Sequence, residues 1–179
     1  MKKVFLLTAI AGLFAFSSVK AQKDVAMTGP KLGIGAEFAF PMGDFGDVYN
    51  LGFGGSLLYQ HPVAANLNLT GSAGYTTFTG KKYEAGGVTI KAKDAGFIPV
   101  KAGARYFVAE NFYIGGELGA AFSTADGGKT AFAYAPGIGI EFPVSDGGAI
   151  ELGGRYEGWS ANSTTSSFIE VRLPYNLGL

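Results

Sequence analysis

The sequence contains no cysteine and a single histidine among its 179 residues. The absence of cysteine excludes a disulfide scaffold, a thiolate metal site, a cysteine nucleophile and a lipid anchor on cysteine. One histidine gives little basis for a histidine metal site, so we expect neither a metal ion nor a cofactor. Basic and acidic side chains number 14 each and cancel. A nucleic-acid partner, which needs a concentrated basic surface, is therefore not expected.

Long apolar runs are also missing once the first 21 residues are set aside. No later stretch approaches the roughly 20 residues that a transmembrane helix needs. If the remaining chain enters a membrane, it must do so as strands closed into a barrel, because open sheet edges cannot be satisfied in lipid. Glycine is in excess: the 29 glycines are more than twice the usual share of about 7%, without the period of collagen.

The first 21 residues have the layout of a secretory signal peptide. Lys2 and Lys3 precede an apolar stretch, Val4–Phe16, and the expected cleavage point follows Ala21. We expect residues 1–21 to be the signal peptide, residues 22–30 a short periplasmic tail and residues 31–179 an outer-membrane barrel. Removal of Lys2, Lys3 and Lys20 leaves 11 basic and 14 acidic residues, a net charge of −3.

Eight later segments alternate between apolar residues and glycine or polar residues with a period of two, as half-buried strands do. They are Lys31–Phe40, Leu51–Gln60, Asn66–Thr79, Ala95–Phe107, Phe112–Phe122, Thr130–Phe142, Ala149–Glu157 and Ser166–Leu179. The alternation of the fourth segment continues back to Val88, which predicts an early start for that strand. Longer and shorter connections alternate, like outer loops and periplasmic turns. The pattern predicts an all-β fold, an eight-stranded, antiparallel, up-and-down transmembrane β-barrel with four extracellular loops.

Period two does not by itself say which face lies inside the barrel. A soluble, lipocalin-like barrel has its apolar side chains inside, whereas a membrane barrel has them outside. Glycines on the polar face favour the membrane barrel, because a narrow eight-stranded lumen needs small residues and a solvent-facing strand does not. These glycines are Gly33, Gly35, Gly52, Gly54, Gly74, Gly103, Gly115, Gly119, Gly137, Gly139 and Gly153.

The charged residues of the strands lie on the same face as these glycines. Arginine and glutamate that face each other in a closed lumen pair and satisfy one another's charge. We predict a structural charge network in the lumen, and hence poor conduction, from Glu37, Lys101, Arg105, Glu117, Glu141, Glu151, Arg155, Glu157, Glu170 and Arg172.

Aromatic residues of the apolar face gather near the strand ends, as in the two interfacial girdles of membrane barrels. The predicted periplasmic girdle is Tyr59, Tyr106, Phe112, Phe142 and Tyr175. The predicted outer girdle is Phe38, Phe40, Phe53, Tyr75, Phe122, Phe132, Tyr134 and Tyr156. We also expect Trp159, at the start of the last outer loop, to be an interface anchor.

Three segments, Lys31–Phe40, Phe97–Phe107 and Val171–Leu179, resemble the porin-family outer-membrane β-barrel domain of the OmpA/OmpX type. The resemblance implies a bacterial outer-membrane location, with lipid, lipopolysaccharide and the outer-membrane insertion machinery as partners. It also implies that the last strand is the insertion signal, through Tyr175, Leu177 and Leu179. The family's last strand commonly ends in an aromatic residue, and Leu179 departs from that pattern.

Catalytic residues are not expected. His61, the only imidazole, falls in a predicted periplasmic turn, and without it a serine nucleophile lacks its usual base. The predicted function is a structural, envelope-integrity or surface-interaction role, as a monomer and with an unidentified surface ligand. Lysines on the longest loop, Lys81, Lys82, Lys91 and Lys93, are expected to be solvated, with lipopolysaccharide phosphates or a host ligand as the other interpretation. A narrow pore, an outer-membrane lipid-modifying enzyme and a soluble exported binding barrel remain alternatives.

Overall fold

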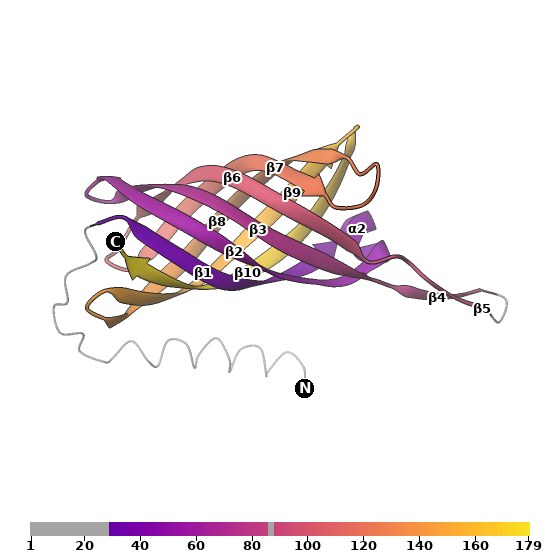
Figure 1. Cartoon of the computed structure of the whole chain (residues 1–179), viewed down its shortest axis with the longest axis horizontal. Helices are drawn as coiled ribbons and strands as arrows, with labels where there is room; N and C mark the ends of the chain where they lie inside the picture. The colour runs from indigo at the N-terminus through magenta and orange to yellow at the C-terminus, as the bar shows by residue number, and fades with distance from the viewer. Residues whose placement is uncertain (1–28, 86–87) are drawn as a thin grey trace.

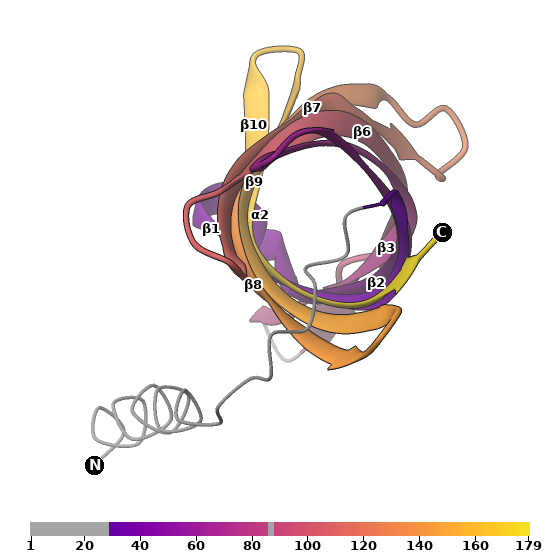
Figure 2. The same cartoon turned by 90° about the vertical axis from the view of Figure 1, so that its left-hand side faces the viewer.

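The computed structural model of the chain describes residues 29–85 and 88–179 and consists mainly of one closed, antiparallel barrel (Figure 1). Around the barrel the strand order is β1-β10-β9-β8-β7-β6-β3-β2, so strands that follow one another in the chain lie side by side. The barrel closes where β1 pairs with β10 (Figure 2). The barrel strands are β1 (Lys31–Met42), β2 (Tyr49–Ala64), β3 (Leu67–Gly80), β6 (Ala95–Phe107), β7 (Phe112–Ser123), β8 (Thr130–Ser145), β9 (Gly148–Ala161) and β10 (Thr164–Gly178). The predicted eight-stranded up-and-down fold is confirmed.

The two ends of the barrel differ. The start of β1 and the C-terminus lie at one end, together with the β2–β3, β6–β7 and β8–β9 turns (Figure 1). The opposite end carries a short helix, α2 (Gly43–Val48), and a two-stranded hairpin of β4 (Lys82–Ala85) and β5 (Val88–Lys91). Among the described residues, no helix is long and apolar enough to cross a membrane.

Three local predictions are corrected by the structure. Val88 does not extend β6 backwards, because β5 leaves the barrel and pairs with β4 instead. His61 is not in a turn: it lies in β2 and pairs with Leu69 of β3. The last outer loop is a two-residue turn at Asn162 and Ser163, both with positive φ, because β9 and β10 continue beyond their predicted ends. The predicted signal peptide and most of the predicted tail lie outside the described residues.

The outside of the barrel is apolar and its inside is polar. Large apolar side chains such as Ile34, at 66% exposure, face outward along the strands. Glu151 and Gln60, by contrast, are fully buried inside. This distribution is the reverse of a soluble barrel's and corresponds to the predicted membrane type.

Space explains the glycines of the inner face. A Cβ added at any of the eleven glycines predicted to face the lumen would come within 3.4 Å of another atom. At Gly52 it would lie 2.5 Å from Cε1 of Phe78, and at Gly137 it would lie 2.8 Å from the Cβ of Arg155. Outward-facing Gly71 and Gly154 have open space at the same position. Side chains inside the barrel are therefore packed against glycine.

Candidate functional site

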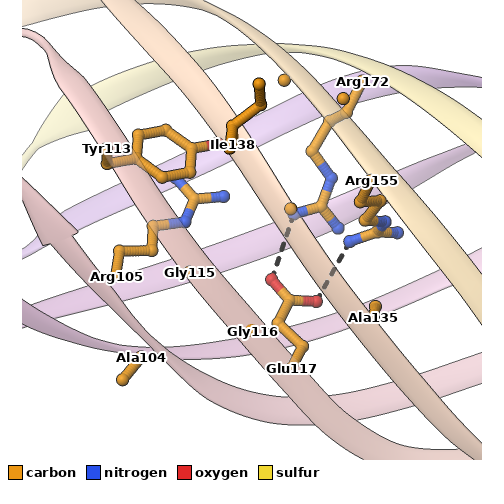
Figure 3. A pocket seen from close by; sticks show the side chains of 13 residues that line it. Ala104, Arg105, Tyr113, Gly115, Gly116, Glu117, Ala135, Ile138, Arg155 and Arg172 are labelled. Carbon is orange, nitrogen blue, oxygen red and sulfur yellow. Dashed lines mark hydrogen bonds and ion pairs between the residues drawn. The ribbon is translucent and has the colours of Figure 1, made fainter.

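The centre of the barrel is a network of ion pairs around Arg155 of β9 and Glu117 of β7 (Figure 3). The Nη1 atom of Arg155 lies 3.0 Å from Oε2 of Glu117, and its Nε lies 2.7 Å from Oε1 of Glu157. Its Nη2 lies 3.3 Å from Oε1 of Glu37 and 2.5 Å from Oε1 of Glu170. One guanidinium therefore joins carboxylates from β1, β7, β9 and β10.

Two further cations complete this central network. Arg172 of β10 places its Nη2 3.0 Å from Oε1 of Glu37 and its Nη1 3.3 Å from Oε1 of Glu117. Lys101 of β6 forms an ion pair with Glu157 and lies 3.9 Å from Oε2 of Glu117. Glu37, Glu117 and Glu157 thus each contact at least two cations, and these contacts offset the free-energy cost of burying their charge.

A second group of charges lies nearer the end that carries the C-terminus. Arg105 donates from Nη1 to Oε2 of Glu151 at 2.8 Å, and the hydroxyl of Tyr113 donates to Oε1 of Glu151 at 2.5 Å. The guanidinium of Arg105 also lies 4.3 Å from the ring centroid of Tyr113, a cation–π arrangement. Lys31 pairs with Glu141 at 2.6 Å.

All ten residues predicted to form the lumen network lie inside the barrel, at 9% exposure or less. The prediction missed the neutral members, Ser56, Gln60, Ser72, Tyr113 and Asn176, which donate to the glutamates. It also missed Lys31, which was assigned to a strand end. All six occupy the polar-face positions of their strands, so the alternation itself was the signal that could have found them. Within the described chain the interior holds six glutamates against five cationic side chains.

The barrel interior is closed by aromatic rings at the end that carries α2. We call this group the aromatic plug: Phe78 of β3, Trp159 of β9 and Phe168 of β10. The ring centroids of Trp159 and Phe168 lie 4.9 Å apart at an interplanar angle of 90°, and those of Phe78 and Phe168 lie 5.2 Å apart. Phe97 of β6 packs against Trp159 with a centroid separation of 5.0 Å. Edge-to-face contacts of this kind are favourable beyond the area that they bury.

The predicted role of Trp159 as an interface anchor is wrong. Its side chain is 3% exposed and points into the barrel, where Nε1 donates to Oε2 of Glu157 at 2.9 Å. At this level the inner face becomes apolar, and on part of the barrel the outward face becomes polar, although Phe132 and Ile169 stay exposed there. On β3, for example, Phe78 is buried inside while its neighbours Thr77 and Thr79 take the outward positions that Tyr75 takes below them.

The helix α2 lies over the aromatic plug and holds the base of the β4–β5 hairpin. Phe45 of α2 packs on Phe78 with a centroid separation of 4.9 Å. The amide of Lys81 donates to the carbonyl of Val48 at 2.8 Å, and the hydroxyl of Tyr83 donates to the carbonyl of Asp47. The hairpin is therefore attached to the barrel through the helix as well as through its own strands.

The predicted girdle residues face outward. Ten of the thirteen are exposed, whereas Phe112, Tyr134 and Tyr156 are half-buried. Tyr134 and Tyr156 lie side by side, with centroids 6.2 Å apart. Of the predicted insertion signal, Tyr175 and Leu177 lie in β10 at 41% and 50% exposure, and Leu179 follows the strand.

The cavity among the lumen charges is small. A cavity of about 30 Å³ between Arg105, Tyr113, Arg155 and Arg172 has room for about two water molecules (Figure 3). His61 lies outside the interior, with Nδ1 3.2 Å from the hydroxyl of Tyr59. Within the described part of the chain, no group of three or more His, Asp or Glu side chains is arranged to hold a metal ion.

Comparison with known proteins identifies relatives of the fold. No family model matches the sequence, and no curated protein matches it significantly. The crystal structure of Ail, the attachment invasion locus protein of Yersinia pestis, aligns over 83% of this chain and 99% of its own, with 20% identity and a TM-score of 0.54. Neisserial surface protein A (NspA) aligns over 84% of this chain and 97% of its own, with 17% identity and a TM-score of 0.61.

A second structure of Ail holds the heparin analogue sucrose octasulfate and aligns with 19% identity, over 83% of this chain and 97% of its own, with a TM-score of 0.53. At these identities the likeness concerns the fold. The chain therefore has the architecture of eight-stranded outer-membrane barrels of the OmpA/OmpX type, as the resemblance in its sequence implied.

Proposed function

We propose that the protein is an integral outer-membrane barrel with a closed interior, and that its non-enzymatic role is exerted by the surface of its outer end. The observation that carries this proposal is the distribution of polarity. Ionic side chains are paired inside the barrel, while an apolar band faces outward with aromatic residues near both rims. Only a lipid environment makes this arrangement favourable. In water, exposure of the apolar band would cost free energy, and the ionic side chains could remain on the outer surface.

The direction of insertion follows from the two ends. The β2–β3, β6–β7 and β8–β9 turns and the C-terminus lie at one end, and α2, the β4–β5 hairpin, the β7–β8 connection and the two-residue β9–β10 turn lie at the other (Figure 1). In outer-membrane barrels the short turns face the periplasm. We therefore assign the α2 end to the cell exterior and propose Tyr175, Leu177 and Leu179 as the insertion signal.

Closure of the interior favours a structural or binding role over transport. A solute would have to pass the aromatic plug, where Phe78, Phe168 and Trp159 are at most 3% exposed, and then the ion pairs around Arg155. The catalytic alternative is poorly supported, because His61 is at the opposite end from the predicted outer leaflet. The complex of Ail with a heparin analogue is one case in which a protein of this fold has a bound ligand, which supports a binding role here.

Two measurements on one sample test the proposal. Protein extracted from membranes should migrate differently on a detergent gel with and without boiling, as folded membrane barrels do. The same unboiled protein, reconstituted in a planar bilayer, should give no stable unitary conductance. Release from membranes without detergent would refute the membrane assignment. A large, stable conductance would refute closure and favour the narrow pore.

A further inference from the structure

The β4–β5 hairpin stands clear of the barrel and carries four lysines (Figure 1). We call it the outer hairpin: β4 and β5 with the flanking residues 80–81 and 92–94. We propose that the outer hairpin is a docking surface for a sulfated polysaccharide, an inference that rests on the proposed placement of this end outside the cell.

Strand register concentrates the positive charge. Lys82 lies directly opposite Lys91 in the antiparallel pair, and both are exposed. Like charges directly opposite one another destabilise a two-stranded sheet, so an anion between them is favourable. Side chains alternate between the faces of a strand, so these two lysines share the face opposite Tyr83 and Ile90. Because Tyr83 bonds to α2, the lysine face points away from the barrel mouth.

Few acidic groups balance these lysines. Two acidic side chains stand against the four lysines: Glu84, which by alternation shares the face of Lys82, and Asp94, which forms an ion pair with Lys91 at 2.9 Å. Asp94 also accepts a hydrogen bond from the amide of Gly80 at 2.9 Å, and this hydrogen bond fastens the base of the hairpin. The other lysines have no ion-pair partner among the described residues, and exposed Lys82 and Lys93 remain available to a ligand.

The height of the lysines above the membrane selects the ligand. Tyr75 is the last exposed apolar residue of β3 and Ile98 is the first of β6. Lys82 and Lys91 are each seven residues beyond these points. Seven strand residues tilted as in membrane barrels rise by about 15–20 Å. The headgroup layer is only about 5–8 Å thick, so lipid phosphates lie below the lysine pair and a soluble polyanion can reach it.

Lysine chemistry fits a polymer with distributed sulfates. The outer hairpin has no arginine, whose planar fork selects single carboxylates and phosphates in a fixed geometry. Lysines act as mobile point charges, and several of them near one another favour a linear polyanion through release of its counterions. Binding should therefore weaken steeply as salt concentration rises.

Immobilised heparin is the probe, with the full-length protein in neutral detergent free of lipopolysaccharide. We expect retention that falls with added NaCl and no retention on neutral dextran. Lys82→Gln should weaken binding about three- to fivefold and the double variant Lys82→Gln/Lys91→Gln about tenfold or more. Lys129→Gln is the matched control, because Lys129 is exposed on the connection between β7 and β8 at the same end. It should change binding less than about twofold.

Each contrary result identifies what has failed. Equal retention of the double variant and the wild type, or equal losses in Lys129→Gln and Lys82→Gln, would refute the hairpin site. Binding to lipopolysaccharide micelles but not to heparin would replace the polysaccharide with a headgroup phosphate. Boiling-dependent gel mobility of the same sample reports the barrel separately. A folded barrel that does not bind heparin therefore refutes this inference and leaves the proposed function in place.

Discussion

Replacement of Arg155 by leucine is the most direct test of the central ion-pair network. Arg155 is 9% exposed and contacts four carboxylates, those of Glu37, Glu117, Glu157 and Glu170. The described interior already holds one more glutamate than cations. Arg155→Leu would therefore leave six glutamates with four cations inside a closed barrel.

The magnitude follows from what each carboxylate retains. Glu37 and Glu117 keep their contacts with Arg172, and Glu157 keeps Lys101. Glu170 loses its ion-pair partner within the described chain. Removing one member of a buried pair typically costs about 3–5 kcal/mol, because the other charge remains buried and unpaired. We expect this loss in Arg155→Leu, with Glu170 as its main source.

A double-mutant cycle separates this charge effect from lost packing. Glu170→Gln removes the stranded charge, so Arg155→Leu/Glu170→Gln should be about 1–3 kcal/mol more stable than the sum of the two single effects. Free energies of unfolding are measured by urea titration in lipid vesicles, with the fluorescence of Trp159 as the signal. Lys91→Gln, which breaks the half-exposed pair with Asp94, is the control and should have no measurable effect. A loss below about 1 kcal/mol in Arg155→Leu, or strict additivity in the cycle, would refute the reasoning.

Three further predictions address the faces of the barrel and the base of the outer hairpin. Ile138→Arg, at a residue 53% exposed on the outside of β8, should cost about 2–4 kcal/mol in the same titration, and Ile138→Leu should be nearly neutral. Gly137→Leu should reduce the folded fraction on an unboiled gel, because its Cβ alone would lie 2.8 Å from that of Arg155; an undiminished folded band would contradict the packing. The Gly80 hydrogen bond and Lys91 lower the pKa of Asp94. The contribution of Asp94 to hairpin order is therefore complete above about pH 3.9, the pKa of the carboxyl in the unfolded chain. It is lost as the pH falls through the lower pKa of the folded state, and the amide resonance of Gly80 would report this loss.

The fold was predictable because alternation and composition agree within the membrane-spanning part. Positions such as Glu37 and Arg172 are on the same face as the glycines in sequence, and they lie directly opposite each other in the β1–β10 register. The identity of individual ion pairs was not predictable. Alternation assigns a side chain to a face, whereas the pairing of Arg155 with Glu37 depends on how far each strand is shifted around the barrel.

Trp159 and Phe168 show where alternation alone misleads. Their positions follow the same parity as the lumen charges, whereas the sequence predicts Trp159 at the start of a loop and outside the barrel. The β4–β5 hairpin was hidden for a related reason. The residues of β5 continue the alternation of β6, and only the pairing of β5 with β4 marks them as part of a separate sheet.

The interior holds buried charge in its middle and aromatic rings at its outer end. In lipid, an apolar core gains nothing over an apolar exterior, so the hydrophobic effect cannot decide which face turns inward. Charged residues decide it, because a one-residue slip of β10 would turn Glu170 and Arg172 toward lipid. On β3, beyond Tyr75, Phe78 faces inward and Thr77 and Thr79 face outward, an arrangement that water favours because it penalises exposed apolar surface. The aromatic plug is an apolar cluster inside the barrel, and Phe45 of α2 packs on it.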